Sequence, residues 1–84
     1  MLNRRTADRT RTHYRVKLIA DEWTFDADLA DHSAEGARLM LDSPVKIGTP
    51  VRLLVARDSF EGEVRYCVYE ADRRRYTVGL RLAS

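Results

Sequence analysis

The stretch that decides the fold reads Trp23-Thr24-Phe25-Asp26-Ala27-Asp28-Leu29. Apolar and polar side chains alternate along it, which is the period of a β-strand with one buried face and one exposed face. The pattern predicts a strand whose apolar residues, Trp23 and Phe25 among them, face a core.

The same period recurs on both sides of this stretch. Five further segments alternate in this way: 16–20, 37–41, 51–56, 64–69 and 75–82. In segment 64–69 the pattern places Val64, Tyr66 and Val68 on one side. Short polar turns, such as Asp58-Ser59, separate the segments, and no segment has the period of a helix. Closing six strands into a barrel removes sheet edges and buries one face of each strand. The sequence therefore predicts an all-β, six-stranded antiparallel β-barrel.

Arginine is concentrated before the first strand. The residues up to Thr12 have no hydrophobic period and carry most of the N-terminal charge, while the whole chain of 84 residues has a net charge of +2. We predict a single domain over residues 1–84, with a flexible basic arm at 1–12 and the barrel at 13–84. A second basic run, Arg73-Arg74-Arg75, is interpreted as a solvated turn.

Composition narrows the function classes. No apolar run approaches the ~20 residues of a membrane-spanning helix, and no apolar segment follows the first five residues as in a signal peptide. Cys67 is the single cysteine, so no internal disulfide can form. A cytoplasmic protein without membrane insertion is expected.

The sequence contains no catalytic or metal-binding pattern. His13 and His32 have no second ligand at metal spacing. Asp31, His32 and Ser33 are adjacent, and neighbouring residues on an extended segment cannot face one another as a catalytic triad requires. We expect no enzymatic activity, no metal and no cofactor.

Two short motifs flank the first two strands. Arg11 and Arg15 form an RxxxR motif before the first strand, and Asp31, Ser33 and Gly36 form a DxSxxG motif after the second. Asp31 has the same parity as the apolar residues of the strand before it. A regular strand would bury it, so we expect either a β-bulge before Asp31 or the end of the strand at the barrel rim.

In this order, the motifs and strands resemble the PilZ domain family. The resemblance runs from Arg15-Val16-Lys17-Leu18 through Ala30–Leu39 and Val45–Val51 to Tyr76-Thr77-Val78-Gly79-Leu80-Arg81-Leu82. It implies a split-barrel type of fold that binds the bacterial second messenger cyclic di-GMP on its outer surface. Tyr66 and Leu82 stand where the family often has tryptophan and phenylalanine, and we interpret both as conservative core changes. The family often has a helix after the barrel, and we expect none here.

The resemblance also implies roles for the motif residues. Arg11 and Arg15 would contact phosphates and guanine edges, Asp31 and Ser33 a guanine base, and Gly36 would allow a close approach or a turn of the backbone. An Arg fork matches guanine O6 and N7 as well as phosphate, and a carboxylate accepts from guanine N1–H and N2–H.

Secondary ligand contacts are expected at Arg9 and Thr10. Thr10 stands where the family often has an arginine, which favours one ligand per site, although Arg9 could substitute.

These features predict a receptor module. Cyclic di-GMP would order the N-terminal arm and thereby relay the messenger level to an unidentified protein partner, with no DNA or RNA bound. Two alternatives stay open: a PilZ-like adaptor that acts without ligand, and a small basic barrel that binds single-stranded nucleic acid.

Overall fold

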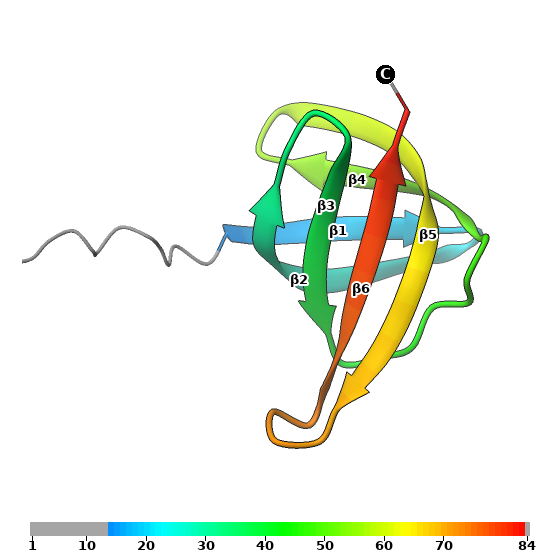
Figure 1. Cartoon of the computed structure of the whole chain (residues 1–84). Coiled ribbons are helices and arrows are strands. Elements are labelled where there is room, and N and C mark those ends of the chain that lie inside the picture. The colour runs from blue at the N-terminus through cyan, green and yellow to red at the C-terminus, as the bar shows by residue number, and fades with distance from the viewer. Residues whose placement is uncertain (1–13, 84) are drawn as a thin grey trace, which may run out of the picture.

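The computed structural model describes residues 14–83, which form six strands and no helix. The strands are β1 (Tyr14–Ala20), β2 (Trp23–His32), β3 (Gly36–Leu41), β4 (Pro50–Val55), β5 (Asp58–Glu70) and β6 (Arg75–Leu82). They close a barrel in the order β1-β2-β3-β6-β5-β4, and every neighbouring pair is antiparallel (Figure 1). The predicted all-β, six-stranded antiparallel barrel is confirmed.

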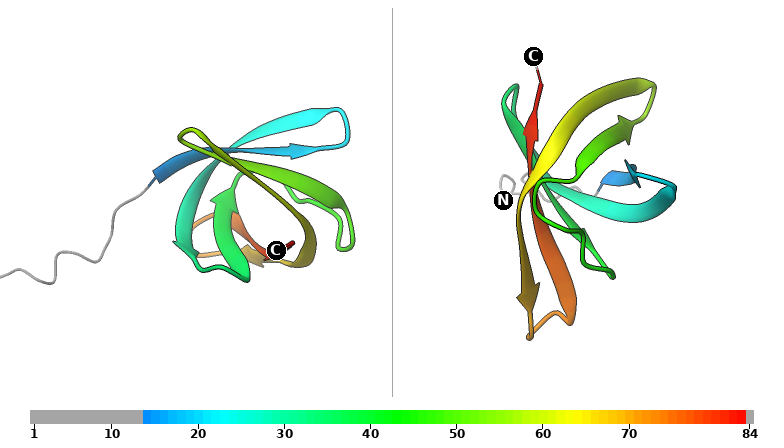
Figure 2. Two further views of the ribbon diagram at one scale, coloured as in Figure 1. Left: turned by 90° about the horizontal axis from the view of Figure 1, so that it is seen from above. Right: turned by 90° about the vertical axis from the view of Figure 1, so that its right-hand side faces the viewer.

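The core fills the barrel interior with aliphatic side chains that alternate with exposed polar ones along each strand. The largest fully buried side chains come from five of the strands. They are Leu18, Leu39, Leu41, Leu53, Val64 and Val78. Two views at right angles show the strands wrapping around this interior (Figure 2).

The aromatic residues at the start of β2 contribute little to this core. Trp23 is 68% exposed, so its predicted place in the core is wrong. It lies at the end of the β1–β2 hairpin opposite Ala20, whereas β3 pairs only with the later part of β2, from Asp28 onward. Phe25 is partly buried and packs against the core.

Two β-bulges interrupt the regular pairing. The register of β2 against β3 shifts between Leu29 and Asp31, so the first of the two alternatives predicted there, a bulge, is confirmed. The register of β5 against β6 shifts between Val64 and Tyr66. Each bulge inserts one residue and so reverses which face the following side chains point to.

Strand β5 is longer than the alternation in the sequence indicates. It begins at Asp58, so the turn predicted at Asp58-Ser59 is wrong and the chain reverses at Ala56-Arg57. Ala56 has a φ of 54°, a left-handed conformation typical of such tight turns. The far end of β5 and the start of β6 form a hairpin that projects beyond the barrel (Figures 1 and 2).

Candidate functional site

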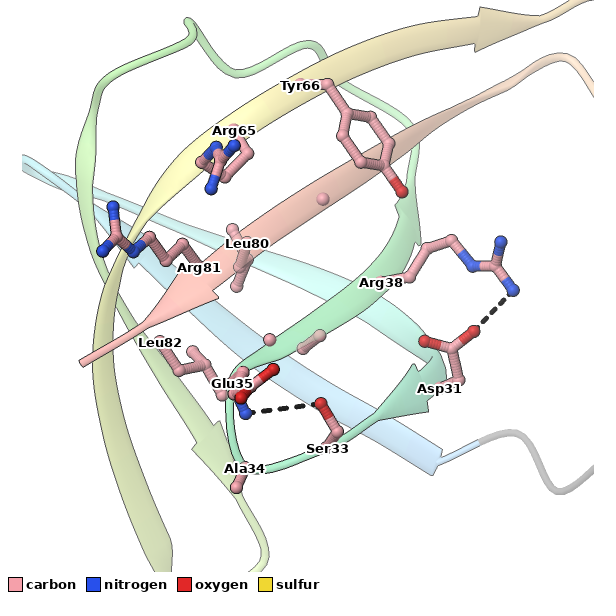
Figure 3. Close-up of a pocket in the computed structure, with 13 residues that line it drawn as sticks. Asp31, Ser33, Ala34, Glu35, Arg38, Arg65, Tyr66, Leu80, Arg81 and Leu82 are labelled. Atoms are coloured by element: carbon pink, nitrogen blue, oxygen red, sulfur yellow. Dashed lines mark hydrogen bonds and ion pairs between the residues drawn. The ribbon is translucent and has the colours of Figure 1, made fainter. Parts of the chain in front are cut away.

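An open groove of about 930 Å³ lies over the outer face of the β3–β6 pair. The β2–β3 turn borders it on one side and the bulge of β5 on the other (Figure 3). Its lining consists of Asp31, Ser33, Ala34, Glu35, Gly36, Ala37, Arg38, Arg65, Tyr66, Gly79, Leu80, Arg81 and Leu82. Its volume falls within the range of small-molecule sites, about 300–1,000 Å³.

Two glycines form part of the floor of the groove. A Cβ at Gly36 would lie 2.7 Å from the backbone oxygen of Leu80, so β3 approaches β6 too closely for a side chain. Gly36 therefore allows the close approach of β3 to β6. Its φ is not in the left-handed region, so a turn of the backbone does not require glycine here. A Cβ at Gly79 would collide with the ring of Tyr66, which occupies the space above this residue.

The bulge in β2 turns Asp31 to the outer face, at the edge of the groove. Its Oδ2 accepts a hydrogen bond from NH2 of Arg38 across the β2–β3 pair, at 2.5 Å. Both side chains are about half exposed. An exposed ion pair of this kind contributes about 0–1 kcal/mol, so a ligand can replace Arg38 as the partner of Asp31 at small cost.

The turn between β2 and β3 is held by its own hydrogen bonds. Ser33 donates its backbone N–H to the Gly36 oxygen at 2.8 Å, and Ser33 Oγ accepts from the backbone N–H of Glu35 at 3.3 Å. The oxygen of Glu35 accepts from the backbone N–H of Leu82 at 2.9 Å, which ties the turn to β6. Hydrogen bonds within the turn and to β6 therefore hold the second motif, with Asp31 and Ser33, in a fixed position.

Of the two arginines of the first motif, only Arg15 lies among the described residues. Arg15 lies on β1 and does not line the groove; its Nε donates to Asp28 Oδ1 at 3.1 Å. Its neighbour Tyr14 pairs with Leu29, so β1 begins beside the end of β2, close to the bulge that carries Asp31 (Figure 1). The predicted contacts Arg9, Thr10 and Arg11, and the predicted arm at 1–12, lie outside the described residues.

The three arginines and the tyrosine of the groove were not among the predicted site residues. Arg65 and Arg81 lie toward one end of the groove, while Arg38 lies beside Asp31 toward the other (Figure 3). Tyr66 is 41% exposed and projects outward, so its predicted place in the core is wrong. The bulge before it reverses the parity on which that prediction depended.

The interpretation of the second basic run is also wrong for one of its members. Arg75 is only 28% exposed; its NH1 donates to Asp28 at 2.6 Å and its Nε to Asp42 at 2.9 Å. The hydrogen bond that Arg75 donates to Asp28 raises the pKa of Arg75 above its ordinary value, against the effect of burial. Arg75 thus holds the start of β6 to β2 and to the end of β3.

The described residues show neither a group of metal-ligating side chains nor a membrane-spanning helix. Within residues 14–83, His, Cys, Asp and Glu side chains form no group of three suited to a metal ion. Within the same range, no helix has the length and apolar character needed to cross a membrane.

Comparison with known families identifies the class of domain. The sequence model of the PilZ domain family matches residues 3–84, which is essentially the whole chain. Comparison with curated proteins finds no match.

Proposed function

The chain belongs to the PilZ domain family, whose members are receptor modules for cyclic di-GMP, and on this premise we propose that it binds cyclic di-GMP in the groove over β3 and β6. The observation that carries the proposal is the position of Asp31. The bulge turns its carboxylate outward at the edge of a groove whose floor includes two glycines.

The chemistry of the groove suits a guanine nucleotide. Guanine presents N1–H and N2–H donors, which a carboxylate such as Asp31 accepts together, and O6 and N7 acceptors, which an arginine fork reads. Arg38 is the partner of Asp31 without ligand and stands where it can turn to the base or to a phosphate. Ser33 offers a hydroxyl beside Asp31 on the braced turn.

The anionic part of the ligand requires further cations. Cyclic di-GMP carries two phosphates, and Arg65 and Arg81 line the groove away from Asp31. We propose that Arg11 and Arg15 supply the remaining contacts, since β1 begins beside the bulge that carries Asp31. Contacts at Arg9 and Thr10 belong to the same proposal.

The receptor acts by binding and not by chemistry in this proposal. Cyclic di-GMP would bring the segment before β1 together with the β2–β3 turn and so change the surface shown to a protein partner. An order–disorder change of this kind needs no catalytic group.

Titration calorimetry with cyclic di-GMP tests the proposal. We expect a submicromolar to micromolar dissociation constant, a binding free energy of about −8 kcal/mol. The variants Arg15→Ala and Asp31→Ala should each bind at least about tenfold more weakly, because each removes a hydrogen bond to a charged group. Asp58→Ala, at the exposed start of β5, is the control and should bind normally, because Asp58 does not line the groove.

Two outcomes would contradict the proposal. Absence of binding at about 100 µM ligand would leave the ligand-independent adaptor as the better account. Displacement of cyclic di-GMP by excess single-stranded oligonucleotide, with a steep dependence on salt, would favour a nucleic-acid-binding barrel.

A further inference from the structure

A network of ion pairs on the outer face of β2 is centred on Asp28. One carboxylate oxygen accepts from Arg15 Nε at 3.1 Å, and the other accepts from Arg75 NH1 at 2.6 Å. Arg75 in turn donates from Nε to Asp42 at 2.9 Å. Both oxygens of Asp28 are therefore used, each by a different strand.

The members of this network differ in exposure. The side chain of Asp28 is 23% exposed and that of Arg75 is 28% exposed, whereas that of Arg15 is 71% exposed. A partly buried charge is stabilised by a partner of opposite charge, and Arg75 is the more buried of the two partners of Asp28. Arg75 therefore fixes the Asp28 carboxylate, which then acts as a stationary acceptor for the exposed Arg15.

Asp28 determines where the end of the Arg15 side chain lies. Arg15 stands on β1 directly opposite Asp28, and the hydrogen bond draws its guanidinium across toward β2, the strand that also carries Asp31. Among residues 14–83, Arg15 forms an ion pair through Nε alone, so its two terminal nitrogens can form a fork with an anion. A free arginine has several rotatable bonds to order on binding, and this contact orders them beforehand.

We propose that Asp28 is a positioning residue for ligand binding: it pre-orders Arg15 for cyclic di-GMP and does not itself contact the ligand. The inference rests on the proposed function and extends it to a residue outside both motifs. The carboxylate thus increases the affinity of the protein for an anion, although its own charge repels one.

A neighbouring ion pair provides a matched control. Lys17 Nζ donates to Asp26 Oδ1 at 2.6 Å on the same two strands, one outward-facing pair further from the bulge. Both of these side chains are more than half exposed, and neither has a second ion-pair partner among residues 14–83. Replacing Asp26 removes the same charge from the same face of β2 without touching Arg15.

The test is a double-mutant cycle on cyclic di-GMP affinity, measured by calorimetry. Asp28→Ala should weaken binding about three- to tenfold, the range expected when one long side chain must be ordered on binding. In an Arg15→Ala background the same substitution should change the affinity less than twofold, because the residue through which it acts is gone. Asp26→Ala should leave the affinity unchanged or slightly increase it.

Asp28→Asn guards against loss of structure in Asp28→Ala. It keeps the shape of the side chain and one acceptor oxygen, so it should fold normally and recover part of the affinity. Additive losses from Asp28→Ala and Arg15→Ala would overturn the proposal, as would tighter binding by Asp28→Ala.

A measurement without ligand separates this inference from the proposed function. The Arg15 Nε–Hε group should give an ordered NMR signal in the wild-type protein and a mobile one in Asp28→Ala, while Asp26→Ala leaves it ordered. A mobile Arg15 in the wild-type protein would refute the positioning role even if cyclic di-GMP binds. An ordered Arg15 in a protein that does not bind cyclic di-GMP would refute the proposed function, and with it the ligand role of Asp28.

Discussion

Replacement of Gly36 by alanine tests the architecture of the groove. A Cβ at this position would lie 2.7 Å from the Leu80 oxygen, and real Cβ atoms essentially never come closer than 3.0 Å. The obstructing atom is backbone, so β3 and β6 must separate by a few tenths of an ångström. Overpacking of this kind costs about 1–3 kcal/mol, which lowers the melting temperature of a domain of this size by roughly 5–20 °C.

Chemical and thermal unfolding followed by far-ultraviolet circular dichroism measure this cost. Gly48→Ala is the control, since nothing lies within 4 Å of a Cβ there and only the strain at its φ of 90° is added. Cyclic di-GMP affinity should fall in Gly36→Ala and stay normal in Gly48→Ala, because Gly48 does not line the groove. A Gly36→Ala protein with the stability and affinity of the wild type would refute the close approach of the two strands.

Three further predictions follow from burial, charge and the groove. Leu18→Ala should destabilise the protein by about 2–5 kcal/mol, since Leu18 is fully buried, whereas Trp23→Ala should change the free energy of unfolding by less than about 0.5 kcal/mol; equal losses in urea unfolding would contradict this. The hydrogen bond from Lys17 lowers the pKa of Asp26, so its stabilising effect is present above the ordinary value of 3.8 and is lost as pH falls through the lowered pKa. Asp26→Asn should therefore flatten the acid limb of stability against pH, and an unchanged limb would contradict the pairing. Tyr66→Ala should weaken cyclic di-GMP binding in calorimetry, because Tyr66 lines the groove. It should lower the free energy of unfolding by no more than about 1 kcal/mol, because the ring lies outside the barrel, and a large loss of stability would show that the ring belongs to the core.

The two bulges show what a sequence pattern can and cannot predict. The alternation along the strand places Asp31 among the buried positions. Burial of an unpaired charge is unfavourable, so the sequence predicts either a β-bulge before Asp31 or the end of the strand at the barrel rim. At Arg65 no such conflict exists, because Tyr66 and Val68 are apolar and fit either face. The second bulge was therefore invisible in the sequence, and Tyr66 was assigned to the wrong face.

The candidate site divides in the same way. Asp31, Ser33 and Gly36 were found because their spacing is a motif, and the structure brings all three to one groove. Arg65 and Arg81 could not be predicted as site residues, because neither lies in a motif and exposed arginines are common on strands. Only the register of the closed barrel places them in the same groove as the β2–β3 turn, and the register between distant strands cannot be read from local periodicity.

The most direct test of cyclic di-GMP binding in this groove is an amide NMR titration of the wild-type protein. We expect saturable shifts concentrated at the β2–β3 turn and at the outer face of β3 and β6, from Asp31 to Arg38 and from Gly79 to Arg81. The β4–β5 turn at Ala56-Arg57 should not move. Absence of any shift at an excess of ligand, or shifts confined to residues away from the groove, would contradict it.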